Sequence, residues 1–236
     1  MSAWKQYRPM GWWLVLVSLS TLVFWLTDLD LWVARFFYTP AKGAKPWLLD
    51  DYPLWKALFY DGVPYLACVV IVSCLLIILV SILRKRYYRW RLYAGYIVLV
   101  FLLGPGLLVN SLFKDHWGRA RPVQVEQLGG TQMYTPPLYY VANGDGRSFP
   151  SGHSSVGFAF IAFWFLWRER KPQWALAALI LTLLFGMTIG LTRMAAGGHF
   201  LSDVLWSAWL PFFSAWVIYY KILCINKQEY TLNSIE

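Results

Sequence analysis

Six apolar segments, each about as long as a lipid bilayer is thick, constrain this chain more than any other feature of its sequence. They cover residues 11–27, 64–83, 92–113, 149–167, 174–191 and 201–223. A helix needs roughly 17–25 apolar residues to cross the hydrocarbon core, so each segment is long enough to span it. The composition agrees, since 58% of the 236 residues are hydrophobic and only 14% are charged. The sequence predicts an all-α polytopic membrane protein with six transmembrane helices, folded as a single domain over 1–236.

The fourth segment is informative because its uninterrupted apolar part, 156–167, is short. It can span only if its helix begins near the polar stretch 150–154. At ~1.5 Å per residue, a helix over 149–167 would be about 28 Å long, close to the hydrocarbon thickness. This start would place Ser151 and His153 in the first helical turn, near the membrane surface.

The first segment has the basic flank of a secretory signal peptide, with Lys5 and Arg8 before the apolar run. A signal peptide would also need a cleavage site of small residues after that run. The chain continues instead with Thr27, Asp28 and Leu29. We therefore expect the first span to be retained.

Positive charge is concentrated on one side of the predicted membrane protein. With the N-terminus inside, the inner segments (1–10, 84–91, 168–173 and 224–236, with Lys221 at the last boundary) hold twelve Lys and Arg against three acids. The outer segments hold nine of each. The positive-inside rule then predicts a multi-pass protein of the inner (plasma) membrane with both termini cytoplasmic. This topology explains the net charge of +9 without nucleic acid as a partner.

Three polar groups lie at the predicted outer ends of the spans. The first, 114–122, contains Lys114 and Arg121 on the side that should be poor in cations. The second, 149–155, begins a helix, and the free N–H groups of a helix start attract anions. Gly152 would let such an anion approach the backbone, and His153 lies beside it. The third, 192–203, contains Arg193 and the pair His199 and Asp203.

His199 and Asp203 are four residues apart and would share one helix face if 199–203 is helical. A carboxylate there would hold one imidazole nitrogen and leave the other free to attack. Cations, a helix start and two histidines in one layer suit phosphoryl transfer. The sequence therefore indicates an active site at the membrane surface. No Cys, His or carboxylate cluster has metal-ligand spacing, so we expect no metal and no cofactor.

The three groups resemble the motifs of the type-2 phosphatidic acid phosphatase family, which read K-x6-RP, PSGH and SR-x5-H-x3-D in that order. Here they are KDHWGRARP at 114–122, PSGH at 150–153 and TRMAAGGHFLSD at 192–203. Every spacing matches, and Thr192 replaces the more common Ser while keeping its hydroxyl. The resemblance covers about 92–223. The first two spans and the loop at 28–63 carry no family signal, and Asp115, His116 and Arg119 occupy variable positions within the first motif.

The resemblance implies a role for each motif residue. His199 would be the nucleophile that forms a phosphohistidine, Asp203 would orient it, and His153 would protonate the leaving oxygen. The phosphate oxygens would be held by five groups: Lys114, Arg121, Arg193, Ser151 and the amide of Gly152. Water would then hydrolyse the phosphoenzyme without a metal.

The expected substrate is a membrane lipid phosphate at the outer, periplasmic face, and no obligate protein partner is evident. Lipid A phosphate, undecaprenyl diphosphate and phosphatidylglycerophosphate all remain open. The long loop at 123–148 favours lipid A, because it is large enough to shape a site for a bulky sugar headgroup. An anionic-lipid transporter is the alternative of a different class, but the chain lacks inverted repeats and mid-membrane charges.

Overall fold

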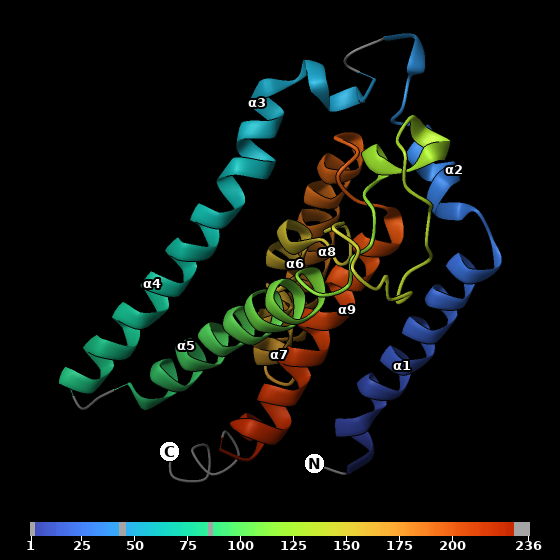
Figure 1. Ribbon diagram of the computed structural model, residues 1–236. Coiled ribbons are helices and arrows are strands. Elements are labelled where there is room, and N and C mark those ends of the chain that lie inside the picture. The colour runs from blue at the N-terminus through green and yellow to red at the C-terminus, as the bar shows by residue number, and fades with distance from the viewer. Residues whose placement is uncertain (1–2, 43–45, 85–86, 229–236) are drawn as a thin grey trace.

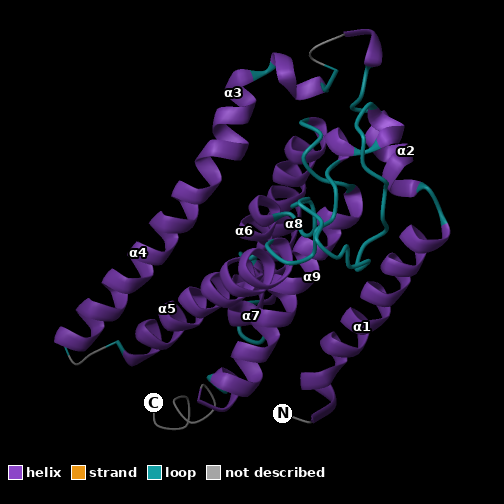
Figure 2. Ribbon diagram, in the orientation of Figure 1, coloured by secondary structure: helices purple, strands orange, loops and turns teal. Residues whose placement is uncertain are grey.

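The computed structural model describes residues 3–42, 46–84 and 87–228 (Figure 1). Within these ranges the regular structure is helical, and Figure 2 shows no strand. Of the inner cations on which the expected orientation rests, Lys85 and Arg86 lie outside the described residues. The C-terminal stretch 229–236 also lies outside them.

Five helical stretches are long and apolar enough to cross a membrane, among the residues described. The first is α1 (Ala3–Leu26); the second joins α3 (Pro53–Lys56), the π-helix η3 (Ala57–Asp61) and α4 (Gly62–Leu83); the third joins α5 (Tyr88–Phe101) and the π-helix η4 (Leu102–Lys114); the fourth is α8 (Pro172–Ala195); the fifth joins α9 (Leu201–Val217) and the π-helix η7 (Ile218–Ile222).

The segment expected over 149–167 is shorter than the others. It forms α6 (Gly152–Phe158) and α7 (Ile161–Trp167), separated by a turn at residues 159–160. The helix begins at Gly152, with Ser151 as its N-cap residue, as the polar stretch predicted. Almost all of α6 is buried by neighbouring helices, so it does not have to match the bilayer thickness along a lipid-exposed face. The described residues therefore contain five long spans and this shorter apolar element, and the predicted count of six spans is not confirmed.

The helices differ in how much of their surface protein covers. Only 11% of the most apolar window is buried in the first span and in the second, against 61% in the last. Figure 1 shows α1 and α4 on opposite sides of a central group that contains α5, α6, α7, α8 and α9. The two flanking spans therefore present apolar faces that suit lipid.

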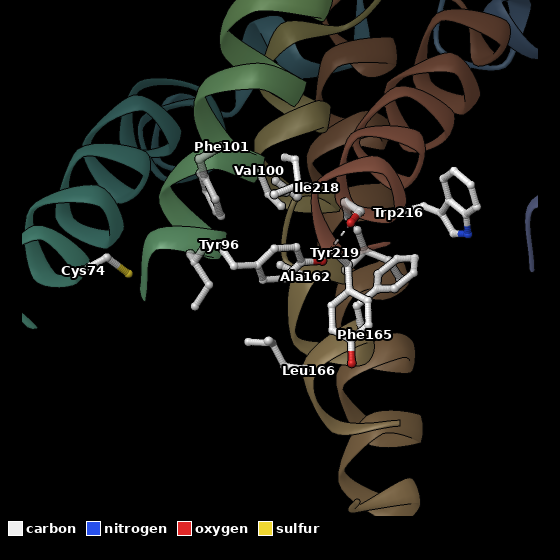
Figure 3. Packing of buried hydrophobic residues seen from close by; sticks show 14 of the residues in the cluster. Cys74, Tyr96, Val100, Phe101, Ala162, Phe165, Leu166, Trp216, Ile218 and Tyr219 are labelled. Atoms are coloured by element: carbon white, nitrogen blue, oxygen red, sulfur yellow. Dashed lines mark hydrogen bonds between the residues drawn. The ribbon is translucent and has the colours of Figure 1, made fainter. Parts of the chain in front are cut away.

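The central group packs around aromatic side chains (Figure 3). Tyr96 of α5, Phe165 of α7 and Tyr219 of η7 are fully buried, with ring centroids 5.8 Å apart for both pairs that include Tyr219. The hydroxyl of Tyr96 donates to the carbonyl oxygen of Ala215 over 3.2 Å. Such rings bury large apolar areas and fix the positions of three helices relative to one another.

Small residues allow α6 and α8 to approach closely. A Cβ on Gly157 would lie 2.8 Å from the Cα of Gly186, so neither position has room for a larger residue without a shift of the backbone. This close contact packs the C-terminal part of α6 against the middle of α8, and the start of α6 and the end of α8 carry motif residues.

The end of the bundle that carries the three motifs is covered by loops and by the short helix α2 (Leu29–Arg35). A second apolar cluster joins α2 to the loop after η4 and to the start of α9; it consists of Leu31, Ala34, Trp47, Ala120, Val125, Leu128 and Phe200. The loop at 28–63, which carried no signal in the sequence, is therefore packed against the region of the three motifs.

Candidate active site

The three motifs meet at this end of the bundle. Lys114 ends η4, His153 is in the first turn of α6, Arg193 is in the last turn of α8, and His199 lies two residues before α9. The positive charges of Lys114, Arg193 and Arg121 act on the rings of both His153 and His199. Segments far apart in sequence thus place three cations around two histidines.

His199 is oriented by a backbone group. Its ring is 1% exposed, and its Nδ1–H donates to the carbonyl oxygen of Ser148 over 2.6 Å. The proton on Nδ1 leaves the lone pair on Nε2, the tautomer that a nucleophilic imidazole needs. Burial, followed by the charges of Arg193 and Lys114, lowers the pKa of His199 well below its usual value. The imidazole is therefore neutral at physiological pH.

Asp203 does not bond to this imidazole directly. One of its oxygens lies 3.7 Å from Nδ1 of His199. The same oxygen accepts the hydroxyl of Ser148 over 2.6 Å and the amide of Phe200 over 2.8 Å. The condition of a helix over 199–203 is not met, because α9 begins at Leu201 with Phe200 as its N-cap. Asp203 is thus linked to His199 through Ser148, a residue outside the three motifs.

Arg119, at a variable position of the first motif, is fully buried beside Asp203. Its guanidinium is paired with Asp203 and also with Asp30 of α2, at 2.9 Å. Burial alone would lower the pKa of Arg119, but the two carboxylates raise it above its usual value. The sequence contained one indication that Arg119 has a structural or functional role. Arg119 lies five residues after Lys114, on the side of the membrane that the positive-inside rule predicts to be poor in cations.

His153 is partly exposed and stacks on Tyr60, with ring centroids 4.5 Å apart and an interplanar angle of 15°. The guanidinium of Arg193 lies 4.3 Å from the centroid of the same tyrosine. Trp55, one turn earlier, donates to the hydroxyl of Thr192 over 2.6 Å. Trp55 and Tyr60 lie in α3 and η3, within the stretch 28–63 that the sequence predicted to be a loop, and no sequence pattern gave a reason to select them.

The second motif lies next to the first. A Cβ on Gly152 would be 2.4 Å from Oδ1 of Asn110 and 3.2 Å from Nζ of Lys114, so a larger residue here would displace the ends of both side chains. The hydroxyl of Ser151 is fully buried and lies 2.9 Å from the hydroxyl of Ser154. Asn110 is itself held by a 2.7 Å bond from Nδ2 to the carbonyl oxygen of Pro105, within the widened turns of η4.

Two cavities flank the histidines and cations. A mainly apolar cleft of about 320 Å³ lies between α4, η4 and α6, with Lys114 and His153 among its lining residues. A second cavity, of about 420 Å³, is lined by Arg121, Arg193, Tyr60 and Lys56 together with apolar groups. Within the described residues, the Nε atoms of Arg121 and Arg193 are buried without a hydrogen-bond partner. These cations are available to a bound anion.

Among the described residues the cations around the imidazole have no carboxylate partner. Such cations around a neutral, oriented imidazole are suited to phosphoryl transfer, and the helices place the site in a membrane protein. Comparison with known proteins gives the family: the PAP2 superfamily model matches residues 92–223, and the chain belongs to this superfamily. It is a membrane phosphatase.

Its relatives include a lipid A 4'-phosphatase of Francisella tularensis subsp. novicida, 38% identical over 204 residues, which are 86% of this chain and 89% of that protein. A lipid A 4'-phosphatase of Rhizobium leguminosarum is 32% identical over 142 residues, or 56% of this chain and 55% of that one. A PAP2-type phosphatidylglycerolphosphate phosphatase of Bacillus subtilis, of known structure, aligns over 91% of this chain and 94% of its own with 18% identity and a TM-score of 0.49.

Proposed function

We propose that this protein removes a phosphate group from lipid A at the outer face of the inner membrane. The observation that carries the proposal is the gathering of Lys114, Arg121 and Arg193 around His199 and His153. The identity of the substrate is supported by 38% identity, over most of both chains, to a lipid A 4'-phosphatase.

The reaction begins with attack by Nε2 of His199 on the phosphorus. The bond from phosphorus to the lipid oxygen breaks, and His153 gives its proton to that oxygen. Lys114, Arg121 and Arg193 hold the three phosphate oxygens as negative charge redistributes among them. Ser151 and the amide of Gly152 complete the phosphate site. Asp203 acts on His199 through Ser148, whose hydroxyl it binds.

Hydrolysis of the phosphohistidine completes the cycle. A water molecule attacks the phosphorus, His153 takes a proton from it, and the bond from phosphorus to Nε2 breaks. Inorganic phosphate leaves and His199 returns to its neutral form. Each histidine therefore ends the cycle in the protonation state in which it began.

The two cavities fit the two parts of a lipid phosphate. The apolar cleft beside Lys114 and His153 would hold acyl chains, and the cavity lined by Arg121, Arg193 and Tyr60 would hold the polar headgroup. With the termini on the cytoplasmic side, the site faces the periplasm and acts on the outer leaflet of that membrane. The whole chain acts as one catalytic domain.

Phosphate release by the purified protein in detergent tests the proposal. The assay compares lipid A, undecaprenyl diphosphate, phosphatidylglycerophosphate and phosphatidic acid, each with EDTA present. We expect fastest release from lipid A, release that survives EDTA, and loss of at least about 10³-fold in the His199→Ala variant. The variant should still bind the lipid.

Three results would contradict the proposal in different ways. A faster reaction with another lipid would change the substrate. Loss of activity with EDTA would remove the metal-free mechanism. Headgroup binding without phosphate release from any lipid would favour an anionic-lipid transporter.

A further inference from the structure

Arg119 and Asp30 form a buried ion pair outside the groups assigned to phosphate binding. Both side chains are 0% exposed, and the guanidinium also donates to the hydroxyl of Ser202 over 2.8 Å and, through Nε, to the carbonyl oxygen of Thr135 over 2.9 Å. Its planar fork thereby connects two carboxylates, Asp30 and Asp203, on different helices. Buried charges persist only when such partners satisfy them.

Asp30 fixes the start of α9. One of its oxygens accepts the amide of Ser202 over 2.9 Å, and the other accepts the hydroxyl of Ser202 over 2.5 Å and that of Tyr134 over 3.1 Å. Ser202 is the second residue of α9, where backbone amides have no partner within the helix. A carboxylate at this end also interacts favourably with the helix dipole. The residue after Ser202 is Asp203.

A continuous set of hydrogen bonds joins this pair to His199. Asp30 binds Arg119, and Arg119 binds Asp203. Asp203 accepts the hydroxyl of Ser148, and the carbonyl oxygen of Ser148 accepts Nδ1–H of His199. All these side chains except that of Ser148 come from α2, the first motif and the third motif. Movement at Asp30 would therefore displace the carbonyl that sets the position and tautomer of the imidazole.

We propose that Asp30 is a positioning residue for this phosphatase, which with Arg119 holds Asp203 and Ser148 so that Nε2 of His199 points at the phosphate. The inference rests on the proposed function and adds a residue outside the family match, which begins at residue 92. It makes the outer helix α2 part of the catalytic machinery. Asp30 lines neither of the two cavities, and its ion pair is with Arg119, which is not one of the cations of the phosphate site, so we expect it to act on turnover and not on substrate binding.

The Asp30→Asn variant tests this role, because it keeps the size of the side chain and removes its charge. We expect kcat to fall by about 10²-fold, the size of effect that a displacement of roughly 1 Å produces, with KM nearly unchanged. Single-turnover formation of the acid-labile phosphohistidine should slow by the same factor. Asp28→Asn is the matched control, since Asp28 is exposed at the start of the same helix, and it should behave as wild type.

A double-mutant cycle distinguishes a positioning role of Asp30 from a general loss of structure. If Asp30 acts through the set of bonds to Ser148, then Asp30→Asn should cost far less in a Ser148→Ala background than in wild type. Thermal unfolding in detergent checks that each variant is folded. Should Asp30→Asn fail to fold, Ser202→Ala removes a hydrogen bond to both Asp30 and Arg119 without changing charge, and it should lower kcat with KM retained.

The proposal is overturned if folded Asp30→Asn or Ser202→Ala turns over like wild type, or if either raises KM alone. It is also overturned if the effects of Asp30→Asn and Ser148→Ala are additive. These outcomes are distinct from failure of the proposed function, in which wild type itself releases no phosphate from any lipid.

Discussion

At the scale of single residues, the site depends on which group holds the nucleophile. His199 donates from Nδ1 to a backbone carbonyl, and Asp203 holds the same residue, Ser148, through its hydroxyl. A carbonyl oxygen only accepts, so it selects one tautomer of the ring. Arg119 pairs with Asp203, and burial together with the charges of Arg193 and Lys114 keeps the imidazole neutral until it reacts.

The depressed pKa of His199 predicts a pH dependence of stability. The unfolded chain, with a histidine pKa of about 6.5, binds a proton that the folded protein excludes. Stability therefore falls as the pH drops below that value. We expect wild type to lose more stability between about pH 7 and about pH 5 than His199→Asn does. Thermal unfolding in detergent at the two pH values measures this, and equal losses would show that burial does not depress the pKa of this ring.

At the scale of elements, helices end where the chemistry requires polar groups. The π-helix η4 contains Pro105, which has no N–H to donate, and its widened turns carry Asn110 and Lys114 to the site. Helix α6 begins at the glycine that leaves room for Lys114. Its partner α8 ends in the turn that carries Arg193. The contact between α6 and α8 thus controls the distance between motifs two and three.

Glycine substitutions test this contact. In Gly157→Ala the new Cβ would lie 2.8 Å from the Cα of Gly186 and 2.9 Å from Cδ1 of Ile189, so the helices must separate. We expect a loss of about 1–3 kcal/mol in the free energy of unfolding and slower phosphate release. Gly95→Ala is the control: its Cβ meets nothing within 4 Å, and alanine should stabilise α5 by up to about 1 kcal/mol. Unfolding curves that coincide for the two variants would refute the tight contact.

At the scale of the whole molecule, the motif loops lie at one end and the start of α1 lies at the other, beside η7 (Figure 1). The amine of Lys221 donates to the hydroxyl of Tyr7 over 2.6 Å, which ties these two helices together at this end. The distribution of Lys and Arg in the sequence predicts, by the positive-inside rule, that this end is the cytoplasmic one. The active site and the termini should therefore lie on opposite sides of the membrane.

Cysteine labelling tests this orientation. In a background without the three native cysteines, Ala142→Cys lies in the exposed loop before the second motif, and Gln173→Cys lies in the exposed first turn of α8. A membrane-impermeant maleimide should label the first variant in cells with a permeable outer envelope and an intact inner membrane. It should label the second only after that membrane is opened. The reverse pattern would invert the proposed topology.

The sequence by itself determined the helical membrane fold, because spans long enough to cross a bilayer must satisfy their backbone groups internally. It also determined the three motifs. Each is a contiguous stretch of sequence whose charged residues lie at the end of a predicted span, where charge is costly unless it has a function. Only the tertiary structure decided that Arg119 and Asp30 are paired, that Ser148 lies between Asp203 and His199, and that Tyr60 stacks on His153. These contacts join residues far apart in the chain, and no periodic pattern records them. The Arg119–Asp30 pair and the Tyr60–His153 stack depend on the packing of α2 against α9 and of η3 against α8.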